Sequence, residues 1–462
     1  MLLKKTIFRE YDIRGKVYDE LNENTIFLIG NGFAAILKRK KISSCIIGFD
    51  ARSYSENFAL LFEKALNESG IDTINIRLCT TPMAYFAQYL LKTKGVAMIT
   101  ASHNPNGWSG LKLGYDFSST FLPQDIKELY NLIEKEEFEK IAEKGKSKMY
   151  DISNEYYKEL TRKVPLNKKM KIVVNGRHGI GGKILSNLLK KAGQEVIEQY
   201  CDIDFNYPRG DANPSIDAMM EETGNLVIKE NADLGFAIDA DGDRLGVVDE
   251  LGNNIYPDKF LIFLARDILE KFPDSKIVFD VKCSQALIDD IKSHKGHPIM
   301  WKTGHSYIKQ KADEINAALA GERSGHIFFY KDYYGFDDAC FSALKLLSYI
   351  EKQNKKLSAI CETIPKYYSS PVMQAYCSDT EKYEIMEKIL DRFKKKFDKI
   401  IDINGARVEF NDGWGLIRPS SNLPAMVMVF EAKTPKKLQE IRDIFKKELL
   451  EFPEISSEWK IG

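Results

Sequence analysis

A serine and a histidine follow a short apolar segment at the point where it gives way to a loop. Val96–Thr100 is apolar and strand-like, Ser102 and His103 come directly after it, and a proline and a glycine then force a turn. The chemistry of α/β proteins is carried by loops at the carboxyl ends of strands. A serine hydroxyl needs an activating neighbour or a metal to act as a nucleophile, and His103 and Lys112 are close in sequence. The pattern predicts a nucleophilic serine, with a polar surface turn as the alternative.

Three aspartates alternate directly after a second apolar strand. Leu234–Ile238 is followed by Asp239, Asp241 and Asp243, whose carboxylates can converge on one hard cation such as Mg²⁺ or Ca²⁺. An EF-hand is disfavoured because Arg244 occupies the loop position that requires glycine, and because both flanks look like strands. The pattern predicts a metal loop, with a solvated acidic turn as the alternative.

Several other segments carry polar side chains suited to a phosphosugar. The segment 321–326 combines Glu, Ser and His, which suit sugar hydroxyls, although an ordinary hairpin loop is the alternative. The segment 418–422 places a guanidinium beside two serines and an asparagine, a set that can hold a phosphate dianion or form a plain turn. The segment 8–15 brings two arginines and a tyrosine, or is only a charged, frayed terminus. Segments 280–283 and 302–306 add Lys, Thr and His at strand ends.

Composition narrows the class of protein. The chain has 462 residues, so roughly three or four domains are expected, and its 67 basic and 67 acidic residues give no field that would favour nucleic acid or an anionic membrane. The seven cysteines are scattered without CxxC spacing, which predicts free thiols in a reducing compartment. The start of the chain is too short an apolar run for a signal peptide, and the longest apolar stretches are far too short to span a bilayer. We therefore expect a cytoplasmic protein.

Strand-like and helical patterns alternate along most of the chain, which indicates α/β layers with largely parallel strands. The expected strands are 45–49, 73–79, 96–100, 171–174, 196–200, 234–238, 246–248 and 276–281, and the expected helices are 58–69, 183–192 and 259–272. No close sequence repeat accompanies this alternation. The C-terminal part predicts a separate α+β domain, with helix 380–397, strands 405–410 and 425–432, and a last helix that begins at Pro435 with Thr434 as its N-cap. Residues 365–370 are the expected linker.

Taken together and in this order, these segments resemble the α-D-phosphohexomutase family, most of all its bacterial phosphomannomutase/phosphoglucomutase branch. The shared motifs are YDIRG, TASHNP, DxDxDR, TGH, GExSG and a C-terminal Arg-Ser-Asn phosphate motif, and they run from Phe8 to Pro424. Each motif alone is weak, but their common order and spacing make chance an inadequate explanation.

The resemblance implies a fold and an activity. The expected fold is three related α/β domains (1–150, 151–253, 254–366) and a smaller C-terminal α+β domain (367–462) around a central active-site cleft. The expected activity is that of an isomerase, an intramolecular phosphotransferase that interconverts hexose 1-phosphate and hexose 6-phosphate. Its phosphoserine would pass the phosphoryl group through a bisphosphorylated sugar, which turns over in the cleft. The implied cofactors are Mg²⁺ and a hexose 1,6-bisphosphate activator, and the implied partners are hexose phosphates, with no nucleic acid and no membrane.

The resemblance also implies roles for residues at matching positions. The phosphoserine and metal site would comprise Ser102, Asp239, Asp241 and Asp243. Proton transfer and charge stabilisation would fall to Lys112, Arg14, His103 and His305. Substrate contacts would come from Tyr11, Arg244, Lys282, Thr303, Gly304, Glu322, Ser324, His326, Arg418, Ser420, Ser421 and Asn422, with the C-terminal group and Tyr11 on the phosphate that is not transferred.

One departure from the family pattern and several alternatives stand beside this interpretation. Arg323 replaces the methionine usual in mannose/glucose enzymes, and His178 receives no role. The preferred sugar is therefore open, as is a phosphoglucosamine mutase of the same family. A non-catalytic phosphosugar-binding protein would lack Ser102 or a metal-loop aspartate, and neither is missing. A phosphoesterase that hydrolyses instead of transferring is a third alternative. The oligomeric state is undetermined.

Overall fold

Two compact units make up the protein. The computed structural model describes residues 3–138, 143–421 and 423–461. Unit 1 comprises Met1–Phe260 and Ser324–Ile360, and unit 2 comprises Leu261–Arg323 and Cys361–Gly462. Each unit contains two parts of the chain that are distant in sequence. Among the described helices, none combines the length and the apolar character needed to cross a membrane.

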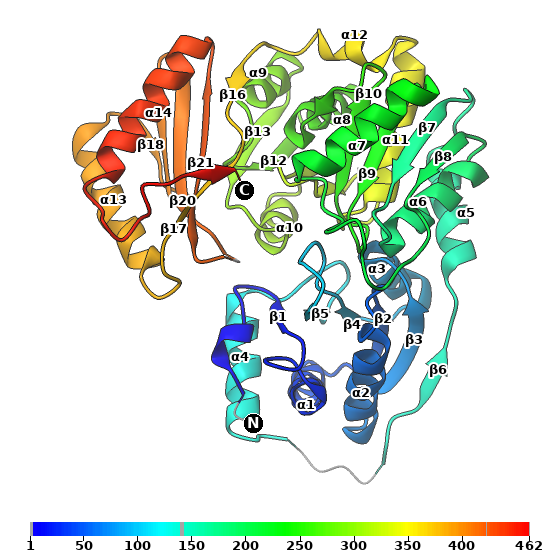
Figure 1. Ribbon diagram of the computed structural model, residues 1–462. Coiled ribbons are helices and arrows are strands. Elements are labelled where there is room, and N and C mark those ends of the chain that lie inside the picture. The colour runs from blue at the N-terminus through cyan, green and yellow to red at the C-terminus, as the bar shows by residue number, and fades with distance from the viewer. Residues whose placement is uncertain (1–2, 139–142, 422, 462) are drawn as a thin grey trace. The chain divides into compact units, whose positions relative to one another are not determined.

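The first sheet of unit 1 is mixed, with order β1-β5-β4-β2-β3-β6 (Figure 1). Its strands are β1 (Ile13–Lys16), β2 (Ser44–Phe49), β3 (Asp72–Leu78), β4 (Gly95–Ile99), β5 (Trp108–Gly114) and β6 (Ser147–Met149). Strand β2 pairs in parallel with β3 and β4, whereas β5 runs antiparallel to both β4 and β1. The short 3₁₀ helix η1 (Lys5–Ile7) precedes β1. The segment from Lys5 to Lys16 is thus ordered and ends as an edge strand of the sheet, rather than a frayed terminus.

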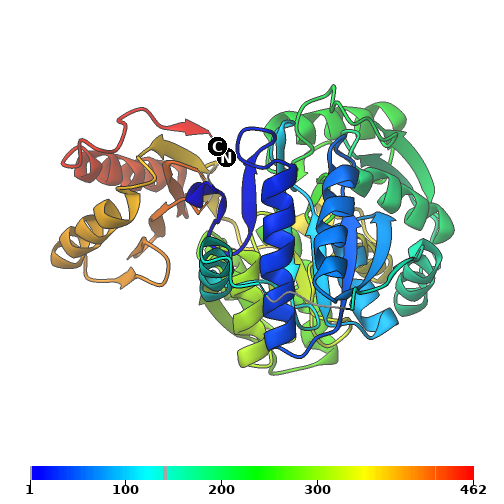
Figure 2. The same cartoon turned by 90° about the horizontal axis from the view of Figure 1, so that it is seen from below.

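Four amphipathic helices accompany this sheet: α1 (Glu23–Arg39), α2 (Ser55–Glu68), α3 (Thr81–Leu91) and α4 (Pro123–Glu134). Helix α1 begins where the Asn22 side chain accepts a hydrogen bond from Thr25 N, as is usual for an N-cap. It packs against both α2 and α4, and Figure 2 shows the blue helices α1 and α2 side by side. Their apolar faces and the sheet share one core around Phe33, Phe58, Phe62 and Phe121.

The second sheet of unit 1 has the order β11-β10-β9-β7-β8. Its strands are β7 (Lys171–Asn175), β8 (Glu195–Gln199), β9 (Leu234–Ile238), β10 (Leu245–Asp249) and β11 (Asn254–Ile255), and the helices of this region are α5 (Ser153–Lys163), α6 (Ile180–Lys191) and α7 (Asp217–Glu230). Strand β7 pairs in parallel with β8 and β9, and β9 forms an antiparallel hairpin with β10. Strand β15 (Ile327–Phe329) and helix α11 (Ala339–Gln353) also belong to this unit.

Unit 2 contains three strands that pair in parallel, and it also contains a separate antiparallel sheet. Strand β12 (Lys276–Asp280) pairs in parallel with β13 (His297–Trp301) and β14 (Leu319–Gly321). Helices α9 (Gln285–Ser293) and α10 (His305–Glu314) follow β12 and β13. Helices α8 (Pro257–Lys271) and α12 (Leu357–Cys361) span two of the three points where the chain passes from one unit to the other, and the third lies between Arg323 and Ser324.

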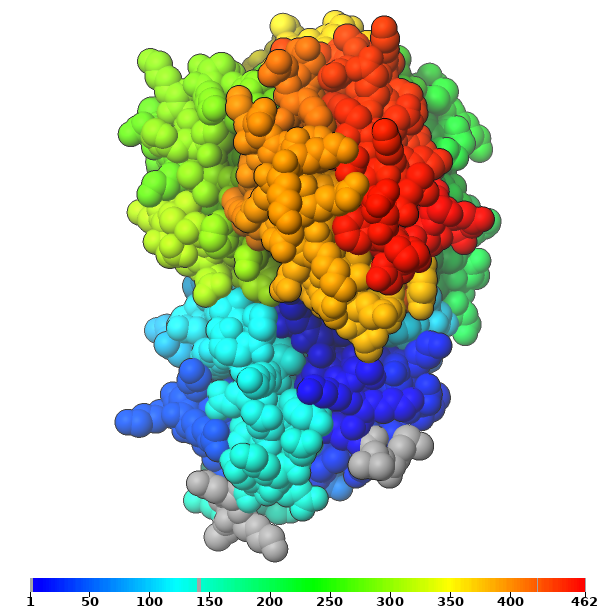
Figure 3. Space-filling model, turned by 90° about the vertical axis from the view of Figure 1, so that its left-hand side faces the viewer, coloured from blue at the N-terminus to red at the C-terminus, as the bar shows by residue number. Residues whose placement is uncertain are grey.

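The antiparallel sheet of unit 2 has the order β18-β19-β20-β21-β17-β22, and β16 also pairs with β21. Its strands are β16 (Tyr368–Ser369), β17 (Met373–Tyr376), β18 (Ile400–Ile401), β19 (Ala406–Phe410), β20 (Gly413–Pro419), β21 (Ala425–Ala432) and β22 (Lys460–Ile461). Helices α13 (Lys382–Lys396) and α14 (Pro435–Leu449) contact this sheet, and Phe393, Phe430 and Phe445 lie in the common core. Figure 3 shows the C-terminal part of the chain, coloured orange to red, as one continuous surface.

The α/β class and the α+β character of the C-terminal part are confirmed, and most predicted elements lie within three residues of their expected bounds. The Thr434 cap is confirmed, because its side chain accepts a hydrogen bond from Lys437 N. Within the expected linker 365–370, Tyr368–Ser369 forms the short strand β16 on β21. Backbone pairing with a strand more than sixty residues away overrides the local turn signal there.

Candidate active site

Ser102 lies in the loop that joins β4 to the antiparallel strand β5. The residue is buried and has a positive φ of 52°, an uncommon conformation for a residue with a side chain. Its Oγ lies 3.1 Å from His103 Nδ1 and donates a long hydrogen bond of 3.5 Å to Asp239 Oδ2. Strained backbone held by its surroundings is typical of functional sites. The loop therefore presents the Ser102 hydroxyl to the aspartate loop.

The three aspartates converge in the turn of the β9–β10 hairpin. Asp239, Asp241 and Asp243 are buried, and one carboxylate oxygen from each lies within 4.8 Å of the others. The backbone N–H groups of Asp243 and Arg244 donate to Asp239 Oδ1 at 3.0 and 3.1 Å, which fixes the turn. The flanking strands confirm that this is no EF-hand. The burial also rules out the solvated acidic turn.

The aspartate loop offers free oxygens to a cation. Within the described part of the chain, Asp241 Oδ1 and Asp243 Oδ1 are buried without a hydrogen-bond partner. Buried carboxylate oxygens without donors are costly, and a hard divalent cation would satisfy them. The donor set therefore fits a metal ion bound by oxygens.

Lys112 on β5 is the cation nearest to these carboxylates. Its Nζ donates to Asp241 Oδ2 at 2.8 Å and forms a second, short contact with Asp243 Oδ2. Thr81 Oγ1, at the start of α3, donates to the same Asp241 oxygen at 2.7 Å. Burial by itself lowers the pKa of Lys112, but the two carboxylates outweigh it and raise that pKa well above its ordinary value. Three carboxylates thus face a single ammonium group. The turn therefore contains more acidic than basic groups.

Neighbouring charges shift the other titratable groups of this region. Burial, together with Asp243 and Asp241, raises the pKa of Asp239 well above its ordinary value. Burial also opposes ionisation of Asp243, but Lys112 and then His326 lower its pKa below the ordinary value. These opposite shifts reflect where the single ammonium group lies among the carboxylates.

The first strand contributes a second cation to the Ser102 loop. Arg14 on β1 is buried, and its Nη1 donates to Ala101 O at 3.1 Å and to Asn104 Oδ1 at 2.6 Å. Its Nε donates to Asp12 Oδ2 at 2.7 Å. Burial, followed by the charges of Arg244 and Arg14, lowers the pKa of His103 well below its ordinary value. The positive side chains here thus favour a neutral imidazole beside Ser102.

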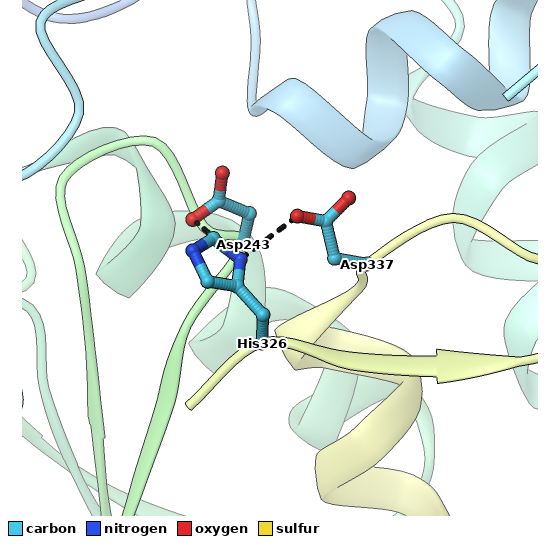
Figure 4. A group of neighbouring side chains, drawn as sticks. All are labelled: Asp243, His326 and Asp337. Atoms are coloured by element: carbon cyan, nitrogen blue, oxygen red, sulfur yellow. Dashed lines mark ion pairs between the residues drawn. The ribbon is translucent and has the colours of Figure 1, made fainter. Parts of the chain in front are cut away.

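A second group of potential metal ligands consists of Asp243, His326 and Asp337 (Figure 4). His326 Nδ1 lies 2.8 Å from Asp337 Oδ2 and 3.6 Å from Asp243 Oδ1, and Arg244 Nε donates to His326 Nε2 at 2.9 Å. A guanidinium can only donate, so Nε2 accepts and the ring proton lies on Nδ1, facing the carboxylates. A protonated nitrogen cannot bind a metal, so this group is better described as a series of close polar contacts that orients Arg244.

Unit 2 gathers the predicted contacts from segments 280–283, 302–306 and 321–323 around Asp280. Asp280 Oδ2 accepts from Thr303 Oγ1 at 2.8 Å and lies 3.3 Å from Lys282 Nζ, while Oδ1 accepts from Arg323 N at 3.1 Å. Gly304 N donates to Glu322 Oε1 at 2.5 Å. Burial opposes the ionised form, but Lys282 and these hydrogen bonds lower the pKa of Asp280 below its ordinary value. A buried carboxylate thus connects Lys282, Thr303 and the backbone of the predicted sugar loop.

The C-terminal sheet of unit 2 carries the predicted phosphate group. Arg418 on β20 is buried, its Nη2 donates to Ser421 Oγ at 3.2 Å, and its Nε has no partner within the described residues. Ser420 Oγ accepts from Leu423 N at 3.2 Å, which stabilises the turn after β20. The predicted contact Asn422 lies outside the described residues. An unpaired buried guanidinium N–H is suited to an anionic oxygen.

The predicted residues thus fall into separate groups. Unit 1 contains Ser102, His103, Lys112, Arg14, the three aspartates, Arg244, Ser324, His326 and Tyr11, and unit 2 contains Lys282, Thr303, Gly304, His305, Glu322, Arg418, Ser420 and Ser421. Sequence reasoning gave no role to Asp50, Arg52, Thr81, Asp280 or Asp337, whose side chains bond to the predicted residues or to their loops. Asp50 and Asp280 each stand at the end of an apolar strand, which is a signal that could have revealed them. His178 Nδ1 lies 2.9 Å from Asp202 O, and nothing here gives it a functional role.

Comparison with known proteins agrees with this architecture. Four family models of phosphoglucomutase/phosphomannomutase match in succession: alpha/beta/alpha domain I (residues 5–140), domain II (154–252), domain III (256–368) and the C-terminal domain (374–448). A phosphomannomutase/phosphoglucomutase of Pseudomonas syringae is 35% identical over 97% of this chain and 96% of its own length. A phosphoglucomutase of Neisseria meningitidis is 35% identical, with 96% of each chain covered.

A solved structure shows the same fold. A phosphoglucomutase/phosphomannomutase family protein of Burkholderia thailandensis superimposes with a TM-score of 0.91 at 31% sequence identity, covering 97% of this chain and 98% of its own. The family models cover most of the chain, and the relatives match it over nearly their whole lengths. The chain therefore belongs to the phosphoglucomutase/phosphomannomutase family.

Proposed function

We propose that this protein is a phosphohexose mutase that interconverts hexose 1-phosphate and hexose 6-phosphate through phosphorylated Ser102. The observation that carries the proposal is the placement of the Ser102 hydroxyl 3.5 Å from Asp239 Oδ2, in a buried group that also contains Lys112 and the other two aspartates. Phosphoryl transfer depends mainly on positioning and on positive charge around the transferred group. The buried group positions the hydroxyl, and a bound cation together with the nearby basic side chains would supply the positive charge.

The transfer exchanges one P–O bond for another. The bond between phosphorus and Ser102 Oγ breaks as a bond to a sugar hydroxyl oxygen forms, and the hydroxyl proton leaves to a base of the site. His103 is the candidate base in unit 1, since its Nδ1 lies 3.1 Å from Ser102 Oγ. The product is a bisphosphorylated sugar. That sugar then turns over, and its other phosphoryl group returns to Ser102.

We propose Mg²⁺ as the cofactor, with Asp239, Asp241, Asp243 and Ser102 as its ligands. The two partnerless aspartate oxygens and the excess of carboxylates over ammonium groups support this assignment. Bound Mg²⁺ would supply positive charge that stabilises the equatorial oxygens of the transferred group. Arg14 and Arg244 would add positive charge from the protein itself.

We propose that the remaining predicted residues recognise the rest of the substrate. Glu322, with Ser324 and His326 from the continuation of the same loop, would hydrogen-bond the sugar hydroxyls. Lys282, Thr303, Gly304 and His305 would add ligand contacts. Arg418, Ser420, Ser421 and Asn422, with Tyr11, would hold the phosphate that is not transferred, and the unpaired Nε of Arg418 supports this role.

Further parts of the proposal concern partners and context. Hexose phosphates are the proposed substrates, and a hexose 1,6-bisphosphate is the proposed activator because it can rephosphorylate Ser102. Cytoplasmic localisation is supported by seven free cysteines, six of them buried. We also propose domain boundaries at 1–150, 151–253, 254–366 and 367–462.

The test is a turnover assay combined with mass spectrometry of the phosphopeptide. Purified protein with Mg²⁺ and a trace of glucose 1,6-bisphosphate should convert glucose 1-phosphate or mannose 1-phosphate to the 6-phosphate, and phosphate should be found on Ser102. Ser102→Ala should lose nearly all turnover, and near-normal activity of that variant would refute the nucleophile. Glucosamine 1-phosphate in the same assay separates the phosphoglucosamine mutase alternative, and release of inorganic phosphate at the turnover rate would favour the phosphoesterase.

A further inference from the structure

The chain contains three sets of three parallel strands, and a short polar turn follows the central strand of each set. Strands β2, β7 and β12 each pair in parallel with two neighbours. At their carboxyl ends the chain reads Asp50-Ala-Arg52, Asn175-Gly-Arg177 and Asp280-Val-Lys282. In each, an acidic or amide side chain precedes a basic one by two residues. The repeat is so short that it becomes apparent only when the strand order is known. Its first copy, residues 50–52, is hydrogen-bonded to the Ser102 loop.

The carboxylate of Asp50 organises the start of the Ser102 loop. Its Oδ2 accepts from Thr100 Oγ1 at 2.8 Å and from Ala101 N at 3.3 Å, and its Oδ1 accepts from Ser55 Oγ at 2.6 Å. Thr100 Oγ1 in turn accepts from Ser102 N at 2.7 Å. Asp50 is 1% exposed, so these bonds are made away from water. A continuous series of hydrogen bonds thus runs from Asp50 to the backbone of Ser102.

The guanidinium of Arg52 holds the carbonyl side of the same loop. Its Nη2 donates to Ser102 O at 3.0 Å and to Asn104 O at 2.6 Å, and its Nη1 donates to Pro105 O at 3.0 Å. Its Nε donates to Asp50 Oδ2 at 3.2 Å, so Asp50 also orients the guanidinium. The planar fork of arginine can satisfy several acceptors at fixed angles, which lysine cannot do. Arg52 thus fixes three carbonyl groups of a loop that contains no regular structure.

We propose that Asp50 and Arg52 are positioning residues for the nucleophile: they hold Ser102 in its left-handed conformation and keep its Oγ directed at Asp239. This inference rests on the proposed phosphoryl transfer, and neither side chain needs to touch the substrate. A non-glycine residue with φ of 52° requires support from its surroundings. The bonds to Ser102 N, through Thr100, and to Ser102 O hold the peptide groups on both sides of its Cα.

The second copy of the turn provides a matched control. Arg177 is 4% exposed, close to the 3% of Arg52, and it occupies the same place after β7. It donates to Asp211 O at 3.2 Å and pairs with Glu222 at 3.1 Å. None of these partners belongs to the Ser102 loop or to the aspartate loop. Loss of Arg177 therefore removes a buried arginine of the same kind without releasing the nucleophile.

The experiment compares Arg52→Ala, Arg52→Lys and Arg177→Ala for kcat, KM and thermal midpoint. It also measures the hydrolysis of radiolabelled phosphoserine without sugar. We expect Arg52→Ala to lower kcat by about 100-fold, the loss associated with an ångström-scale misplacement of a reacting group. KM should stay nearly constant, and Arg52→Lys should recover only part of kcat. Hydrolysis of the phosphoserine should also change, whereas Arg177→Ala should lower only the thermal midpoint.

The outcomes separate the inference from the function on which it rests. An inactive wild-type enzyme would refute the proposed function itself. A folded Arg52→Ala enzyme with the kcat of Arg177→Ala would overturn the positioning role. If Arg52→Ala does not fold, Thr100→Val and Thr100→Ser decide the matter, because only the serine keeps the hydroxyl between Asp50 and Ser102 N. Equal kcat values for those two variants would likewise overturn it.

Discussion

Asp280 offers the sharpest test of how unit 2 supports substrate binding, through the substitution Asp280→Asn. The wild-type carboxylate accepts hydrogen bonds from Arg323 N and Thr303 Oγ1 and lies 3.3 Å from Lys282 Nζ. Asparagine can keep the bond to Arg323 N through its Oδ1. Its amide N–H₂ would then face the ammonium of Lys282, and two donors cannot bond to each other. The change therefore releases Lys282 while the sugar-loop backbone stays attached.

The magnitude follows from the contact that is lost. A hydrogen bond to a charged group contributes about 1.5–3 kcal/mol. If Lys282 contacts the substrate, its displacement should raise KM by roughly 10- to 150-fold, since each 1.4 kcal/mol is about tenfold. The phosphorylation of Ser102 should be unchanged, because Ser102 belongs to unit 1 and makes no described bond to Asp280.

The assay is saturation kinetics with glucose 1-phosphate, coupled to detection of the 6-phosphate, with phosphopeptide mass spectrometry in parallel. Asp289→Asn is the control, because Asp289 is a carboxylate of the same unit that accepts from Gln285 Nε2 and Tyr367 OH rather than from predicted ligand contacts. An unchanged KM for Asp280→Asn, or the same increase in both variants, would refute the reasoning.

Three further predictions concern other parts of the molecule. Asp241→Asn should weaken Mg²⁺ binding measured by calorimetry on the order of 100-fold, because a charged ligand becomes neutral, and unaltered binding would contradict the metal assignment. Arg418→Ala should raise KM by roughly 10- to 150-fold, equivalent to about 1.5–3 kcal/mol, while Ser102 remains phosphorylated, and wild-type kinetics would remove Arg418 from the site. Burial raises the pKa of Asp338 to about 6, above its value of about 3.9 in the unfolded chain. Burial thus disfavours the ionised carboxylate in the folded protein, so the stability of the wild type relative to Asp338→Asn should fall by about 2 kcal/mol from pH 4 to pH 7 in denaturant unfolding. A pH-independent difference would show that Asp338 titrates normally.

Local sequence determined much of the fold and the chemical character of the site. Short apolar segments predicted β2, β4, β9 and β12 nearly to the residue, because the burial of a short apolar run depends on its own composition. The placement of Ser102 and the aspartates directly after such strands predicted where they would lie. The burial of both groups and their approach to within hydrogen-bonding distance are confirmed.

Strand pairing decided what local signals could not. Tyr368–Ser369 has the composition of a turn but becomes β16 because β21 offers an unpaired edge. The charged start of the chain becomes β1 because β5 supplies its partners, which brings Arg14 to the Ser102 loop. Backbone pairing depends on which strands become neighbours, and no window of local sequence contains that information.

Strand pairing also decides which residues support the site. Asp50 and Arg52 precede Ser102 by about fifty residues, and Asp280 precedes Arg323 by 43. They meet because β2 and β4, like β12 and β14, are parallel neighbours, so that their carboxyl ends share one edge of the sheet. The sequence by itself determined which side chains could carry the chemistry. Only the tertiary structure decided which buried carboxylates and arginines hold them in place, because those hydrogen bonds depend on strand order and register rather than on neighbours along the chain.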